Sequence, residues 1–152
     1  MSKSRNKSRT GSSGPRQVPG TNISFSQARR MLPLVGRIVT DIRDLWGNVT
    51  RLEAEQSDLD RRRRKLEWPE RKRRYQIGED ISLEQRKLQD SAAELEQLEV
   101  LLIDPVQGEV AFPTVLGGRP AYFLWKLGDT DLSWWCFAQE AGRHPIPASA
   151  MR

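Results

Sequence analysis

Apolar residues recur alternately three and four positions apart along residues 35–66, and only Gln56 and Arg63 interrupt the series. This is the heptad spacing of a long helix that packs along one narrow stripe. At ~1.5 Å per residue, the stretch predicts a helix of about 48 Å. The apolar positions of this first stripe are Val35, Ile38, Ile42, Leu45, Val49, Leu52, Leu59 and Leu66.

A second, weaker stripe follows at the same spacing, with Glu84 and Ser91 at two of its positions. We expect the two helices to fold back antiparallel about Pro69 and Glu70, so that paired residue numbers sum to 140. Gln56 then faces Glu84, and a matched polar pair is one way to fix the register of a coiled coil. The alternative is that both side chains are partly exposed and coincide by chance. The apolar positions of the second stripe are Ile77, Ile81, Leu88, Leu95, Leu98 and Leu102.

Local signals predict where the first helix begins. Ser24 and Gln27 have the spacing of a capping box, so the helix should start at Phe25. Pro33 lies inside the pattern, and it either kinks the helix or ends a short separate one.

The ends of the second helix are less sharply marked. Gly78 weakens its start, and the pattern becomes firm only from Ile81, which would make residues 67–79 a longer connection than a tight turn. The helix should end by Asp104, because Pro105 disfavours helical geometry in the residue before it.

From Pro105 the hydrophobic period changes to two, which predicts a small antiparallel meander rich in aromatic residues. Both of its faces are apolar, so both need cover. The sheet should pack on the base of the hairpin near residues 31–38 and 95–103, or pair two hairpins in a homodimer. The predicted strands are residues 109–112, 115–116, 121–127 and 132–137.

The predicted fold class is therefore mainly α (α+β): a long antiparallel coiled-coil helical hairpin with a small C-terminal antiparallel β-meander. The expected division is a disordered basic tail, the hairpin, the meander and a short tail. Their ranges are 1–22, 23–104, 105–147 and 148–152, in that order.

The amino-acid composition limits the possible shape and cellular location of the protein. A chain of 152 residues with 30% charged and 37% hydrophobic residues has little material for a spherical core, which fits an elongated shape. The single cysteine, Cys136, excludes an intramolecular disulfide and any site built from several cysteines. No run approaches the ~18 apolar residues of a membrane span. A cytoplasmic protein that does not enter the membrane is expected.

The net charge of +5 is unevenly distributed. Residues 1–20 carry five cations and no acid, and residues 61–74 carry nine cations and two acids. The second stretch would lie at the hairpin tip, where arginines can bind phosphate and Trp68 or Tyr75 can stack on a base or a lipid head group. Alternatively, the tip is only solvated, or neutralised by the acidic second helix of a neighbouring molecule. The candidate contacts are Arg61, Arg62, Arg63, Arg64, Lys65, Trp68, Arg71, Lys72, Arg73 and Arg74.

Several segments of the chain together form a recognisable pattern. They are residues 23–33, 108–113, 118–129, 134–135 and 142–146. With the two long helices between them, they resemble the bacterial family known as domain of unknown function 2203, over about residues 23 to 147. The resemblance implies a helical hairpin with a small β element, but no activity. Leu124 stands where the family pattern usually has cysteine, and Cys136 where it usually has histidine.

Little else in the chain points to chemistry. His144 is the sole histidine and lies in a Gly, Arg and Pro setting, while Cys136 lies in a predicted strand among tryptophans. We expect no enzyme, no cofactor and no metal site.

Two functions of different classes are expected. The heptads favour a non-enzymatic interaction or scaffold protein that self-associates as a homodimer or binds an unidentified protein partner. The alternative, from the basic tip and tail, is electrostatic binding of RNA or DNA.

Overall fold

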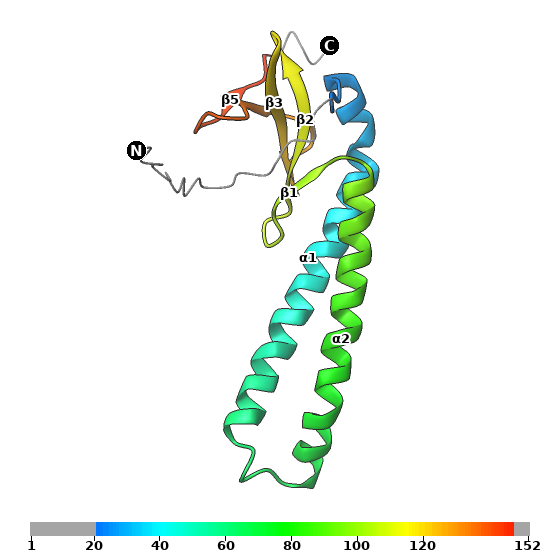
Figure 1. The fold of residues 1–152 in the computed structure, drawn as a ribbon, viewed down its shortest axis with the longest axis vertical. Helices are drawn as coiled ribbons and strands as arrows, with labels where there is room; N and C mark the ends of the chain where they lie inside the picture. The colour runs from blue at the N-terminus through cyan, green and yellow to red at the C-terminus, as the bar shows by residue number, and fades with distance from the viewer. Residues whose placement is uncertain (1–20, 148–152) are drawn as a thin grey trace, which may run out of the picture.

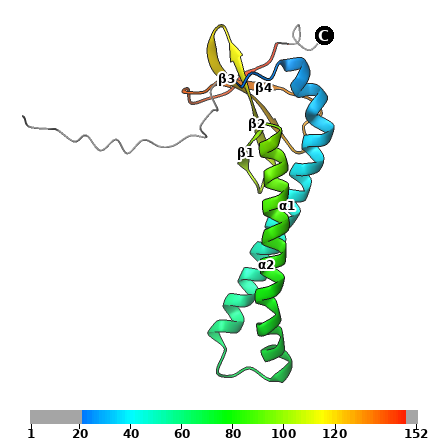
Figure 2. The same ribbon diagram turned by 45° about the vertical axis from the view of Figure 1, so that its right-hand side comes forward.

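The computed structural model describes residues 21–147. The predicted tail at 148–152 and all but the last two residues of the predicted tail at 1–22 lie outside these described residues. Two long helices form an antiparallel hairpin, and a five-stranded antiparallel sheet lies at one end of it (Figures 1 and 2). The predicted fold class is thus confirmed. None of the described helices is long and apolar enough to cross a membrane.

Helix α1 (Phe25–Arg61) begins as the sequence predicts. The Ser24 hydroxyl accepts a hydrogen bond from the Gln27 N–H (3.1 Å), and the Gln27 side chain accepts one from the Ser24 N–H (3.0 Å). Pro33 lies inside this continuous helix and does not separate a short one. Its ring is exposed, so it lies on the solvent side, where a helix tolerates the local disturbance best.

Helix α2 (Trp68–Gln97) starts thirteen residues earlier than the sequence pattern suggested, so the predicted long connection over 67–79 is wrong. Pro69 lies in its first turn, where a backbone N–H would have no helical partner and its absence costs nothing. The chain therefore reverses over residues 62–67, before the proline.

The expected register is also wrong. Asn48 donates a hydrogen bond to Glu84 (Nδ2 to Oε2, 3.3 Å), and Leu52 packs with Ile77 and Ile81, so paired numbers sum to 129–133 and not 140. Glu84 thus meets Asn48 and not Gln56. A shift of about one heptad leaves apolar positions facing apolar positions, so the hydrophobic pattern alone does not distinguish the two registers.

The second helix does not continue to Asp104. It ends at Gln97, and Glu99 takes a left-handed conformation (φ 61°). The Val100 N–H bonds to the Leu95 carbonyl (3.3 Å) and the Glu99 N–H to the Glu96 carbonyl (2.8 Å), which is a Schellman motif. Residues after it become the first strand, so Leu102 belongs to the sheet.

The sheet is a meander in which each strand pairs with the next along the chain. One strand covers residues that the sequence divided into two at Pro113, and the short final strand was not predicted. Pro113 has no N–H, but its carbonyl accepts a hydrogen bond from the Ile23 N–H (2.8 Å). The strands are β1 (Leu101–Asp104), β2 (Glu109–Leu116), β3 (Arg119–Lys126), β4 (Trp134–Phe137) and β5 (His144–Pro145).

The main core lies between the sheet and the base of the hairpin. Phe112 and Phe123 pair across β2 and β3 on the face that packs against Val35 and Val39. The Trp125 ring packs against α1 at Gly36, where a Cβ would lie 3.4 Å from the ring, an ordinary van der Waals contact. The core fixes the sheet to one end of the hairpin and leaves the other end to project.

Candidate nucleic-acid interface

The loop of residues 62–67 forms the end of the hairpin farthest from the sheet (Figure 1). Its one apolar side chain, Leu66, is 4% exposed. The Leu66 carbonyl also accepts a hydrogen bond from Arg71 Nε (2.9 Å). Burial and this hydrogen bond anchor the loop, and the neighbouring cations remain at the surface.

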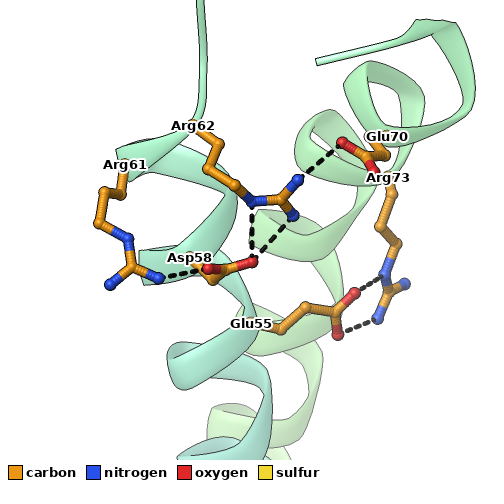
Figure 3. A network of polar contacts seen from close by, with 6 residues as sticks. All are labelled: Glu55, Asp58, Arg61, Arg62, Glu70 and Arg73. Carbon is orange, nitrogen blue, oxygen red and sulfur yellow. Dashed lines mark hydrogen bonds and ion pairs between the residues drawn. The ribbon is translucent and has the colours of Figure 1, made fainter. Parts of the chain in front are cut away.

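Two of the candidate cations are held by carboxylates at the end of α1 (Figure 3). Arg62 Nη2 lies 2.8 Å from Asp58 Oδ2, and Arg62 Nη1 lies 3.1 Å from Glu70 Oε2 across the loop. Arg61 also pairs with Asp58. The two arginines therefore share one carboxylate.

Arg73 and Arg74 instead tie α2 to α1. The Arg73 guanidinium forms a bidentate pair with Glu55 (2.6 and 3.0 Å) and reaches Asp80 (2.9 Å). Arg74 Nε lies 2.8 Å from Asp60 Oδ1. The Arg73–Glu55 and Arg74–Asp60 contacts join the two helices near the tip, and the first is a fork-like pair of charged hydrogen bonds.

The pairing shifts the ionisation of the groups involved. The hydrogen bond from Arg73 lowers the pKa of Glu55, and those from Arg61 and then Arg62 lower the pKa of Asp58. The same carboxylates raise the pKa of Arg62 and Arg73. Glu55 and Asp58 thus stay charged to a lower pH than unpaired carboxylates would.

The other five cations of the tip make no ion pair within the described part of the chain. Arg71 is bonded only to a backbone carbonyl, and the other four are exposed. A shallow depression of about 460 Å³ at the end of α1 is lined by Asp60 and the five consecutive cations of residues 61–65. The cations outside ion pairs are Arg63, Arg64, Lys65, Arg71 and Lys72.

The structure brings every predicted site residue to the tip, but it divides them into paired and unpaired sets. Arg63 was expected at a core position of the first stripe, and this is wrong because α1 ends at Arg61 and Arg63 is exposed. The sequence reading missed the role of Asp58. Its spacing of three and four residues from Arg61 and Arg62 is the signal that could have found it.

Trp68 lies on the first turn of α2 and is 72% exposed, and Tyr75 is 81% exposed. Trp68 follows the loop directly, and Tyr75 lies two helical turns further along α2. The tip therefore combines positive charge with exposed aromatic surface.

Charged pairs elsewhere in the molecule brace the fold. Arg29 makes a bidentate pair with Asp131 (Nε to Oδ1, 3.0 Å; Nη2 to Oδ2, 2.8 Å), which joins the start of α1 to the loop after β3. A depression of about 670 Å³ lies beside this pair. Arg143 pairs with the nearly buried Glu109. Neither pair was expected from the sequence, because its members lie far apart in the chain.

Cys136 lies on β4 and His144 on β5, and His144 Nε2 lies 3.8 Å from Glu140 Oε2. Burial raises the pKa of the Cys136 thiol, which keeps it protonated. His144 is exposed, with its ring centroid 4.6 Å from that of Trp135. Among the described residues, no group of three or more His, Cys, Asp or Glu side chains is placed to hold a metal ion.

Comparison with known proteins gives one match. No curated protein and no solved structure matches the chain. A family model described as "Uncharacterized conserved protein (DUF2203)" matches residues 23–146, which include both helices and the whole sheet. The chain therefore belongs to the DUF2203 family.

Proposed function

We propose that this chain is a non-enzymatic binding protein that holds a nucleic acid, RNA in the first place, by its phosphates at the hairpin tip. The observation that carries the proposal is the depression lined by residues 60–65. Three of its five cations, Arg63, Arg64 and Lys65, have no carboxylate partner among residues 21–147. Arginines without such partners are available for charged hydrogen bonds to phosphate oxygens.

The hairpin supports this role by projecting the tip. The apolar core that joins α1 to the sheet ends near Ile42, about 20 residues before the helix ends. At ~1.5 Å per residue, the tip projects by about 30 Å. A bulky polyanion can then contact the tip without meeting the sheet.

The test is binding of the full chain to a fluorescent RNA of about 20 nucleotides, measured by anisotropy across a series of salt concentrations. We expect log affinity to fall linearly with log salt. Replacing Arg63, Arg64 and Lys65 by Gln should weaken binding and lower the slope by about 2, since each single-strand phosphate contact contributes roughly 0.7.

A matched control removes the same charge at the base of the molecule. Arg30, Arg37 and Lys126 are exposed and make no ion pair in the described structure. Replacing these three by Gln should leave the slope within error. Absence of RNA and DNA binding at low salt, or equal losses in both triple variants, would refute the proposal.

The basic segment of residues 1–20 is a second proposed contact, since its five cations have no neighbouring acid in the sequence. Its deletion should weaken RNA binding uniformly across sequences, as expected for phosphate contacts. Unchanged affinity after deletion would remove the tail from the proposal.

A scaffold function is the second candidate, favoured by the outer face of α2. A shallow depression of about 510 Å³ lies there beside the exposed Leu83 (52% exposed). A second copy of the chain or a protein partner could cover it. Sedimentation velocity at high protein concentration tests self-association: a dimer that Leu83→Glu disrupts supports the scaffold, and a strict monomer excludes the homodimer. The lining residues are Tyr75, Gly78, Glu79, Ser82, Leu83 and Arg86.

The proposal includes a bacterial cytoplasmic location and knobs-into-holes packing of the hairpin as a coiled coil. The location is supported by the absence of a span in the described helices. The packing is supported by the heptad spacing. Cell fractionation tests the first, and a crystal structure of the hairpin tests the second.

A further inference from the structure

We infer that the hairpin tip takes unpaired nucleic acid, with bases stacked on Trp68 and Tyr75, in preference to a duplex. This inference rests on the proposed function and specifies its ligand. Trp68 and Tyr75 are the two most exposed of the large hydrophobic side chains in the described structure. Such rings gain from contact with another flat apolar surface.

Trp68 and Tyr75 lie on the same side of α2. Residues seven apart lie two turns along α2, about 10.5 Å, and nearly in line around its axis. Arg71 and Lys72 lie between them in the sequence, one on each side of that line, and neither has an ion-pair partner in residues 21–147. The face thus alternates aromatic ring, cations and aromatic ring.

This alternation fits the chemistry of a single strand. In a duplex the base faces are covered by their neighbours, so exposed rings have nothing to stack on and only the cations contribute. An unpaired strand offers free base faces. The rise from position 68 to position 75 along the helix axis is about three times the 3.4 Å spacing of stacked bases. The rings therefore take non-adjacent bases, and the backbone between these bases passes over the two cations.

The basic loop alone would not make this distinction. Phosphate contacts alone would favour a duplex, because its higher charge density releases more counterion per contact, about 0.9 against about 0.7 for a single strand. Preference for a single strand therefore has to come from the two rings. Charge and selectivity then reside in different residues, which makes them separable by mutation.

The experiment compares a single-stranded RNA of about 20 nucleotides with a blunt duplex of the same length, both binding to the full chain at fixed salt. We expect the single strand to bind at least roughly tenfold more tightly. In the Trp68→Leu, Tyr75→Leu double variant, single-strand affinity should fall about tenfold or more, while duplex affinity and the salt slope stay unchanged. Tryptophan fluorescence quenching on RNA binding should shrink in the same variant.

Trp46→Leu is the matched control, since Trp46 is a half-exposed tryptophan (43%) on α1, away from the tip. It should leave both affinities unchanged, and circular dichroism should show that each variant keeps its helices. Equal binding of duplex and single strand, unaffected by the double variant, would overturn the inference while leaving the proposed function intact. No binding of either RNA would overturn both. A parallel arm with single-stranded DNA tests whether the 2′-hydroxyl contributes.

Discussion

At the base of the hairpin, fourteen buried residues from both helices, the sheet and the connecting segments form one apolar core. At the distal end, the corresponding cluster has three members, Leu52, Ile77 and Ile81. The base is held by shape and burial, whereas the tip depends on a thin apolar stripe supplemented by charged pairs. The same two helices therefore form a packed support for the sheet at one end and a charged surface at the other.

The contrast follows from what each end packs against. At the base, the sheet contributes a second layer, so the helices bury residues on a wide face. Beyond Ile42 each helix has only the other helix as a neighbour, and a two-helix hairpin buries one stripe. The side chains around that stripe are therefore free to be charged.

The largest effect is expected from removing an aromatic ring at the base. Phe112 is fully buried, so Phe112→Ala should cost about 3 to 5 kcal/mol of unfolding free energy through lost burial and a cavity. Tyr75→Ala, the same kind of truncation at the exposed tip, should change stability by less than about 0.5 kcal/mol. Urea denaturation measures both. Similar costs for the two variants would contradict the proposed contrast between base and tip.

Truncation of a buried residue in the small cluster near the tip should destabilise the tip and leave the sheet unaffected. Ile77 is fully buried but belongs to the small cluster, so Ile77→Ala should cost about 2 kcal/mol, at the low end for such truncations. Amide hydrogen exchange should accelerate near the tip and leave the sheet protected. Ile42→Ala, in the main core, is the control and should accelerate exchange in the sheet as well. Faster sheet exchange in Ile77→Ala would show that the two ends unfold as one unit.

The base was also the part that sequence could predict best. The period of two over residues 109–137 predicts strands because burial on a sheet alternates, and the heptads predict which helix faces meet. The register was not predictable by the same means, because displacing one helix by a heptad restores the apolar match. What sets it is the reversal at residues 62–67 and polar contacts such as Asn48 with Glu84.

The candidate site was likewise predictable from the sequence only in part. Its cations were evident from the sequence, since nine basic residues in fourteen need no structure to be found. Which of them are available was not evident, because Arg73 is paired with Glu55, eighteen residues away in the chain. Such a pairing depends on the register, and the predicted register would have placed other residues opposite Arg73.

A smaller effect is expected from breaking the pair across the helices. Arg73→Gln removes the bidentate contact with Glu55 and the contact with Asp80, each about one-third exposed or more, so the cost should stay below about 1 kcal/mol. Hydrogen exchange should accelerate at the tip. Lys72→Gln removes the same charge from the neighbouring position, where no ion pair is present in the described structure. An equal response in Lys72→Gln would mean that net charge, and not pairing, governs the stability of the tip.

The smallest effect is expected from acid. Because the pKa of Glu55 is lowered, the stability of the tip should fall as the pH falls. The Arg73 hydrogen bond is the main cause of this lowering, so the pair contributes stability that is complete above the ordinary carboxylate range, about pH 4. That contribution is lost only as the pH falls through the lower pKa of the folded state. In a carbon-detected NMR titration, the Glu55 carboxylate should therefore titrate at a higher pH in Arg73→Gln than in the parent chain. An unchanged midpoint would mean that the pair does not persist in solution. The helices would then be joined near the tip by the apolar stripe and by the other pairs, Arg62 with Glu70 and Arg74 with Asp60. Arg73 would join the cations available to phosphate.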